Sequence, residues 1–88
     1  MYEAKVKLTN EVGLHARPAS LFIQEAVKYS SDIEVIKDNK TYNGKSIMGI
    51  LSMGASKGEE ITIRAYEDDK EEAVKALIDI VNNKLKEY

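Results

Sequence analysis

The repeat of apolar residues along this chain switches between two periods, and that switch limits the folds it can adopt. Near the N-terminus every second residue is apolar, as in a strand with one buried face: Tyr2, Ala4, Val6 and Leu8. The segment "EITIRAY", residues 60–66, alternates in the same way, and its inward side is Ile61, Ile63 and Ala65. Between them, "IEVIK" and "KTYN" flank Asp38–Asn39, two residues that tolerate left-handed backbone, so these segments predict a hairpin.

Three other segments have the spacing of helices. A helix is expected over about residues 16–29, and its apolar side is Ala19, Phe22, Ile23, Ala26 and Val27. A short helix is expected between Ser46, a good N-cap, and Gly54, a good C-terminal stop. A last helix follows Asp69, which together with Glu72 resembles a capping box. The apolar stripe of this last helix is Val74, Leu77, Ile78, Val81 and Leu85.

Together these elements run in the order β-α-β-β-α-β-α over 88 residues, which is the length of a single domain, residues 1–88. Four half-buried strands need cover on one face, and three helices with single apolar stripes provide it. The sequence therefore predicts an α+β fold, a two-layer open-faced sandwich whose other sheet face meets water.

The composition of the chain argues against several classes of function. The chain has no cysteine and one histidine, so neither a disulfide framework nor a transition-metal site is expected. The net charge of −2 does not suggest a nucleic-acid binder. No apolar run has the roughly 18 residues of a membrane span, and the charged N-terminal segment lacks the apolar core of a signal peptide. We expect a cytoplasmic protein with no metal, no cofactor and no membrane insertion.

The stretch "EVGLHARPAS" contains the chain's only histidine, His15, and its only proline, Pro18. Proline suits the first turn of a helix, where its missing N–H would have no partner, so Pro18 sets the start of the helix just before it. His15 would then lie at that start, beside the free N–H groups of Ala16 and Arg17 and the positive end of the helix dipole. These residues predict a nucleophilic imidazole next to an anion site, with the Arg17 guanidinium as a partner for phosphate. We expect Gly13 to keep the approach to this site open.

The same residues admit a plainer interpretation. A lone histidine near a helix start is usually a surface residue, Arg17 could be a solvated charge, and Pro18 could do no more than begin the helix. Spacing alone leaves both interpretations open.

Two motifs add a resemblance to a known family. The stretches "GLHARPAS" and "GKSIMGILSMGASKGEEITI" closely resemble the bacterial histidine-containing phosphocarrier protein family, HPr, of the phosphoenolpyruvate-dependent sugar phosphotransferase system. The resemblance covers essentially the whole chain and implies an antiparallel sheet in the order 1-4-2-3. It also implies a carrier rather than an enzyme, which accepts a phosphoryl group from enzyme I on Nδ1 of His15 with the help of Arg17. The group would then pass to enzyme IIA proteins of sugar transporters by in-line transfer, in which positioning and charge stabilisation dominate.

Ser46 has one role from its position and a second from the resemblance. As an N-cap it should contribute about 1 kcal/mol to the short helix. The stretch "KSIMG" resembles the regulatory phosphorylation site of HPr proteins from low-GC Gram-positive bacteria, which implies HPr kinase/phosphorylase and catabolite control protein A as partners. A phosphate at this position suits the helix dipole but places negative charge near the docking surface.

The short helix also carries Ile47, Met48 and Leu51, which cannot all face one narrow buried stripe. Exposed apolar residues flanked by Lys45 would form a docking patch, and Met48 suits varied contacts because its side chain is flexible. The resemblance places these three residues on the face that meets enzyme I, enzyme IIA proteins and the regulators. The border of that face would be formed by Ser20 and Gln24.

Two residues depart from the family pattern. Val12 stands where a small polar residue is common, so a side-chain contribution to the phosphate site is lost there. Gly44 stands where a larger apolar residue is common, which could loosen the approach to Ser46.

Two other functions are possible for a chain with this pattern. One is an HPr-like regulator of catabolite repression that uses only the serine, against which the presence of His15 argues. The other is an unrelated small α+β binding module in which His15 is incidental. A monomer is expected at this chain length.

Overall fold

The computed structural model describes residues 1–88 and contains the expected strands and helices in the expected order. These elements are β1 (Tyr2–Lys7), α1 (Ala16–Ala26), β2 (Ile33–Lys37), β3 (Lys40–Asn43), α2 (Ile47–Met53), β4 (Glu60–Ala65), α3 (Lys70–Asp79) and a short π-helix, η1 (Ile80–Lys84). All neighbouring strands are antiparallel and lie in the order β1-β4-β2-β3, which confirms the expected order 1-4-2-3.

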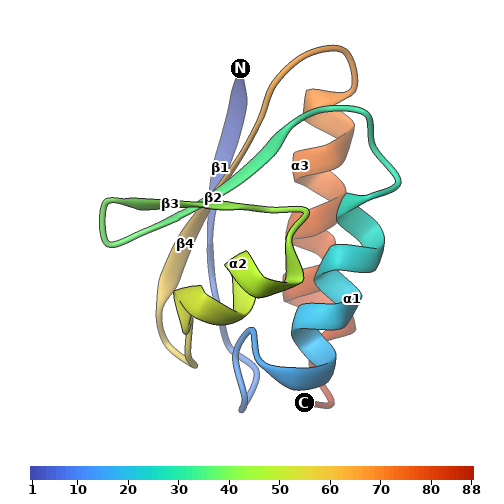
Figure 1. The fold of residues 1–88 in the computed structure, drawn as a ribbon. Helices are drawn as coiled ribbons and strands as arrows, with labels where there is room; N and C mark the ends of the chain where they lie inside the picture. The colour runs from blue at the N-terminus through green and yellow to red at the C-terminus, as the bar shows by residue number, and fades with distance from the viewer.

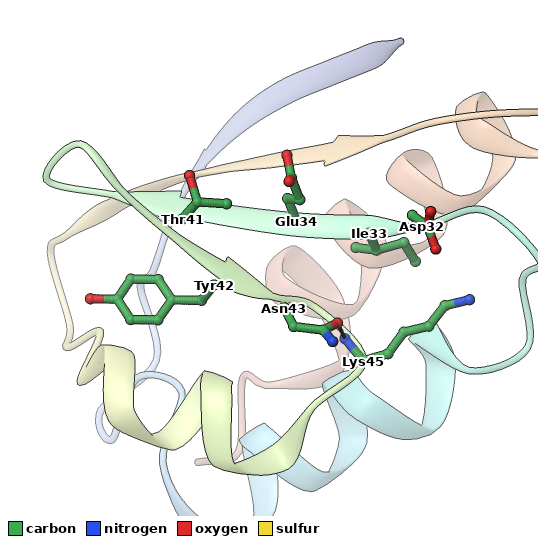
Figure 2. A pocket seen from close by; sticks show the side chains of 7 residues that line it. All are labelled: Asp32, Ile33, Glu34, Thr41, Tyr42, Asn43 and Lys45. Carbon is green, nitrogen blue, oxygen red and sulfur yellow. Dashed lines mark hydrogen bonds between the residues drawn. The ribbon is translucent and has the colours of Figure 1, made fainter.

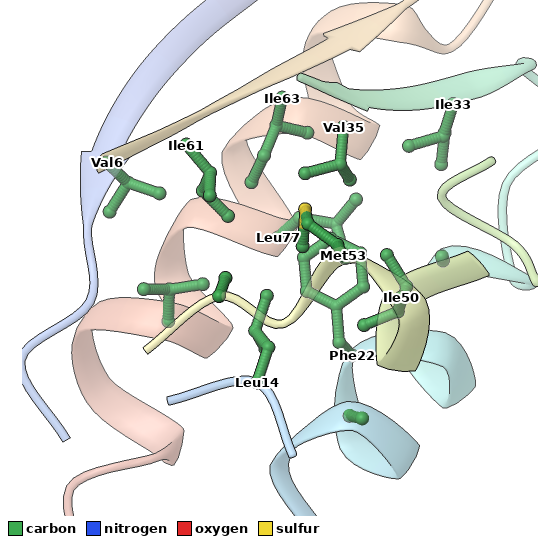
Figure 3. Packing of buried hydrophobic residues seen from close by; sticks show 14 of the residues in the cluster. Val6, Leu14, Phe22, Ile33, Val35, Ile50, Met53, Ile61, Ile63 and Leu77 are labelled. Atoms are coloured by element: carbon green, nitrogen blue, oxygen red, sulfur yellow. The ribbon is translucent and has the colours of Figure 1, made fainter. Parts of the chain in front are cut away.

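The helices cover one face of the sheet, with α1 and α3 side by side and α2 packed against α1 and β3 (Figure 1). The inward positions predicted on β4 are all buried, and on β1 Val6 is buried whereas Tyr2 and Ala4 are half-buried. Strand side chains meet helix side chains in one core (Figure 3), to which the labelled residues Val35, Ile63, Phe22, Ile50 and Leu77 belong. The open face is polar, and there Arg64 pairs with Glu3 across two strands at 2.7 Å.

Helix α1 is shorter than its apolar spacing predicts. It ends at Ala26, and the N–H groups of Lys28 and Tyr29 bond to carbonyls three residues earlier, which makes a tighter turn. Val27, predicted to face the core, is instead 57% exposed. The Nζ atom of Lys45 donates to the Tyr29 carbonyl at 2.6 Å and so satisfies a carbonyl beyond the end of the helix.

The capping box predicted at the last helix does not form. Asp69 precedes α3, but its carboxylate makes no bond to that helix and instead accepts hydrogen bonds from Ser30 and Ser31, in the turn after α1. Two residues of the predicted stripe, Val81 and Leu85, are buried as expected, although the chain reaches them through the wider turn of η1.

Candidate functional site

His15 immediately precedes α1 and has extended backbone, with φ −121° and ψ 161°. Its imidazole is half-buried and forms no hydrogen bond with the rest of the chain. The ring is therefore accessible from solvent, and neither of its nitrogens is occupied by a protein partner. Pro18 is buried in the first turn of α1, where the sequence predicts it.

The loop before His15 is anchored to the segment that follows α2. Gly13 has φ +63°, and a Cβ atom there would lie 2.3 Å from the carbonyl oxygen of Ala55. Leu14 is buried, and its N–H donates to the same carbonyl at 3.0 Å. The expectation that Gly13 keeps the approach to the site open is therefore wrong: Gly13 is buried, and its role is to let two backbone segments touch.

The first turn of α1 offers free donors beside His15. Neither the N–H of Ala16 nor that of Arg17 has a hydrogen-bond partner within the chain, and both residues are exposed. The guanidinium of Arg17 takes part in no ion pair or hydrogen bond. The first turn also has no acidic residue. Uncompensated N–H groups, the helix dipole and a free cation together form a place where an anion would be stabilised.

Ala16 itself has φ +51°, a left-handed conformation that costs a residue with a Cβ atom roughly 1–2 kcal/mol. Nothing in the spacing of the sequence signals this conformation.

Val12, two residues before Leu14, is 44% exposed, and its N–H donates to the Tyr88 carbonyl at 3.0 Å. The C-terminus accordingly lies beside the start of α1 (Figure 1).

Ser46 caps α2 as predicted. Its Oγ accepts a hydrogen bond from the N–H of Gly49 at 3.1 Å, and its side chain is half-buried. At the other end Gly54 has φ +64° and closes the helix, which is the stop that the sequence predicts.

Gly44 does not loosen the segment that leads to Ser46. Its N–H donates to the Ile33 carbonyl at 2.7 Å, and a Cβ atom there would lie 2.4 Å from Cγ2 of Ile33. The expectation of a looser approach is wrong, because glycine is what allows this close contact with β2.

The predicted docking patch is the set Ile47, Met48 and Leu51 of α2, and we keep the name docking patch for these three residues. These side chains are 39%, 72% and 37% exposed, whereas Ile50 and Met53 of the same helix are buried. On the neighbouring α1, Nε2 of Gln24 donates to Oγ of Ser20 at 3.2 Å. The Nζ atom of Lys45, the residue predicted to flank the patch, donates to the Tyr29 carbonyl, and its positive charge takes part in no ion pair.

The largest hollow lies elsewhere, over β2 and β3, and has a volume of about 390 Å³ (Figure 2). It contains none of the predicted site residues, and its lining is mostly polar: Asp32, Ile33, Glu34, Thr41, Tyr42, Asn43 and Lys45. No group of three or more histidine, cysteine, aspartate or glutamate side chains is arranged to hold a metal ion. None of the helices is long and apolar enough to cross a membrane. The candidate site is therefore the exposed start of α1 rather than a cavity.

Comparison with known proteins gives consistent matches. A family model described as "PTS HPr component phosphorylation site" matches residues 2–83. The HPr-like protein Crh of Bacillus subtilis (strain 168) is 46% identical over 77 residues, which cover 88% of this chain and 91% of Crh.

Solved structures agree with this match. HPr-C-His from Thermoanaerobacter tengcongensis is 53% identical with a TM-score of 0.94, covering 97% of this chain and 96% of that one. The phosphocarrier protein HPr from Bacillus anthracis str. Ames is 46% identical with a TM-score of 0.89, covering 92% of this chain and 96% of that one.

Proposed function

Because the chain belongs to the PTS HPr family, we propose that it is a phosphocarrier of the sugar phosphotransferase system, which accepts a phosphoryl group on His15 and passes it on. The observation that best supports this proposal is the environment of His15. Its imidazole has no partner in the chain, and it lies at a helix start with two free N–H groups and an unpaired arginine.

The transfer we propose is an in-line displacement. A ring nitrogen of His15, Nδ1 by the family resemblance, attacks the phosphorus of phosphorylated enzyme I. A new N–P bond forms as the donor's bond to phosphorus breaks. The negative charge on the phosphoryl oxygens is then stabilised by the N–H groups of Ala16 and Arg17 and by the Arg17 guanidinium. In the second transfer His15 is the leaving group: an enzyme IIA protein attacks the phosphorus, its new bond forms as the N–P bond to His15 breaks, and the phosphoryl group goes on to serve sugar uptake. Such a chain is a carrier in a relay of cytoplasmic proteins and not an enzyme.

The docking patch and Ser46 extend the proposal to partners. The exposed side chains of Ile47, Met48 and Leu51 support docking of enzyme I and enzyme IIA proteins, with Ser20 and Gln24 at the border. Ser46 is accessible at the N-cap of α2, which supports phosphorylation by HPr kinase/phosphorylase and binding of the phosphorylated form to catabolite control protein A. A phosphate there would lie next to Ile47 and repel a partner that presents acidic groups.

One alternative also has support. The identity with the HPr-like protein Crh favours a regulator that acts through Ser46 alone. The presence of His15 favours the carrier, since regulators of that type lack the active-site histidine. Dimers are described for an HPr of Thermoanaerobacter tengcongensis and for Crh, so the monomer that we propose as the active form needs a direct measurement of molar mass in solution.

The deciding experiment is intact mass spectrometry after incubation with phosphoenolpyruvate and enzyme I. We expect one added phosphate that disappears after brief acid treatment, because the N–P bond of phosphohistidine is acid-labile, and that is absent from His15→Ala. If competent enzyme I adds no mass, the carrier is excluded. Modification of Ser46 by the kinase alone would then favour the regulator, and no modification by either protein would favour a member of the family that only binds partners and carries no phosphoryl group.

A further inference from the structure

Asn10 is a polar residue buried in the loop between β1 and α1, with 4% of its surface exposed. Its Nδ2 donates to the Gly13 carbonyl at 3.0 Å, and the Gly13 N–H donates to the Asn10 carbonyl at 3.3 Å. These two hydrogen bonds close a turn that ends two residues before His15. The Oδ1 atom of Asn10 is also buried, and it has no hydrogen-bond partner.

An unpaired buried oxygen lowers the stability of a fold, and a small apolar residue at this position would avoid that cost. The same substitution would, however, leave the Gly13 carbonyl without its side-chain donor, so the two effects on stability oppose each other. What the amide of Asn10 does supply is a fixed direction for the Gly13 carbonyl. The next residue, Leu14, is fixed from the other side by its hydrogen bond to the Ala55 carbonyl.

No other side chain of this loop has an equivalent role. The carboxylate of Glu11 is 79% exposed and binds Lys57 at 2.6 Å, outside the turn. Val12 has an apolar, exposed side chain. Asn10 is thus the only residue of the turn whose side chain forms a hydrogen bond within it.

We propose that Asn10 is a positioning residue: by holding the Gly13 carbonyl it sets the path of the backbone at Leu14 and so orients His15. The inference rests on the proposed phosphoryl transfer at His15. In-line transfer requires the attacking nitrogen, the phosphorus and the leaving atom in one line, and a misplacement of about 1 Å can lower a rate up to a hundredfold. The loop also delivers the free N–H groups at the start of α1, so the same turn orients both parts of the anion site.

The experiment compares Asn10→Ala with Ser31→Ala, a control that also removes the side-chain hydrogen bond of a buried polar residue but lies in the turn after α1, away from His15. Transfer from phosphorylated enzyme I is measured over a range of carrier concentrations, with melting curves for all proteins. We expect Asn10→Ala to lower kcat about tenfold or more with KM unchanged, because the docking patch is untouched. Ser31→Ala should transfer like the wild type. If Asn10→Ala does not fold, Asn10→Ser, whose shorter side chain cannot reach the Gly13 carbonyl, replaces it.

A second readout separates this inference from the proposed function. Amide signals of Leu14, His15, Ala16 and Arg17 in ¹H–¹⁵N spectra should move in Asn10→Ala, while those of β2 and β3 stay in place. Wild-type kcat in Asn10→Ala, or amide signals that do not move, would overturn the positioning role. If instead the wild type accepts no phosphoryl group while these signals do move, the carrier function fails and the positioning of His15 stands.

Discussion

Asp69 and Ser31, which are 38 residues apart in the sequence, are joined by two hydrogen bonds to the same carboxylate oxygen. The Ser31 N–H donates to Oδ1 of Asp69 at 2.9 Å, and the Ser31 hydroxyl donates to the same atom. Ser30 donates its N–H and hydroxyl to the other oxygen. These donors, the Ser31 hydroxyl most of all, lower the pKa of Asp69 from 3.8 to about 2. The carboxylate thus ties the end of α1 to the start of α3.

The first prediction concerns acid stability. A carboxyl group whose pKa is lower in the folded state stabilises that state above its unfolded pKa, and the stabilisation is lost as the pH falls through the folded pKa. For Asp69 this loss spans about pH 4 to pH 2. We expect Asp69→Asn to melt below the wild type at neutral pH, and the difference to shrink across that window. Melting curves from pH 2 to pH 7 measure this, with Asp68→Asn as control. A difference that does not change with pH would contradict the assignment.

The second prediction compares two glycines with nearly equal φ, +63° at Gly13 and +64° at Gly54. No atom lies within 4 Å of a Cβ built at Gly54, so Gly54→Ala should lose only about 1 kcal/mol from backbone strain. At Gly13 the new methyl group would also collide with the Ala55 carbonyl, so Gly13→Ala should lose about 3 kcal/mol or more. Urea unfolding of both variants measures the two values. Equal losses would mean that the contact with Ala55 is not tight.

Much of the fold follows from local patterns. Alternation and helical spacing depend on near neighbours, which is why Val6, Ile61 and Ile63 are buried as predicted. The order of the strands is not a local property, and only the family resemblance indicated it. The sequence predicts a later end for α1 than the structure has, because the apolar spacing continues through Val27 after the helix has stopped.

Polar contacts between distant segments could not be predicted. The pair Asp69 and Glu72 matches a capping box in sequence. In the packed structure α1 and α3 lie together, and the Asp69 carboxylate accepts hydrogen bonds from Ser30 and Ser31 instead of from its own helix. At the candidate site, Pro18 was enough to place His15 at the start of α1. The left-handed conformation of Ala16 has no sequence signal, because alanine rarely adopts it.

The third prediction tests the cation beside His15. Arg17 is exposed and its guanidinium forms no hydrogen bond or ion pair, so Arg17→Ala should change the free energy of unfolding by no more than about 0.5 kcal/mol. Transfer from enzyme I should slow about a hundredfold, because a charge that stabilises the moving phosphoryl group is lost. Stopped-flow or quenched transfer assays measure the rate, and Lys28→Ala, an exposed cation on the same chain, is the control. Normal transfer with a large loss of stability would refute this role.

The fourth prediction separates the two roles of Ser46. Ser46→Ala removes the oxygen that accepts from the Gly49 N–H, and we expect a loss of about 1 kcal/mol in stability with normal transfer. Ser46→Asp keeps a capping oxygen and adds a negative charge near the docking patch. It should therefore retain stability but accept the phosphoryl group more slowly, and the deficit should shrink as salt screens the charge. A deficit that is the same at low and high salt would point to altered geometry instead.

The last prediction concerns the docking patch, whose most exposed member is Met48. A side chain that is 72% exposed contributes little to the core, so Met48→Ala should leave the melting temperature close to that of the wild type. If partners bury this side chain, its loss should raise KM for phosphorylated enzyme I about tenfold, while kcat stays the same because the His15 site is intact. The matched control is Ile36→Ala on the open face of the sheet, where no partner is proposed. An effect on KM from Ile36 but not from Met48 would move the docking surface to the opposite side of the molecule, away from both His15 and Ser46.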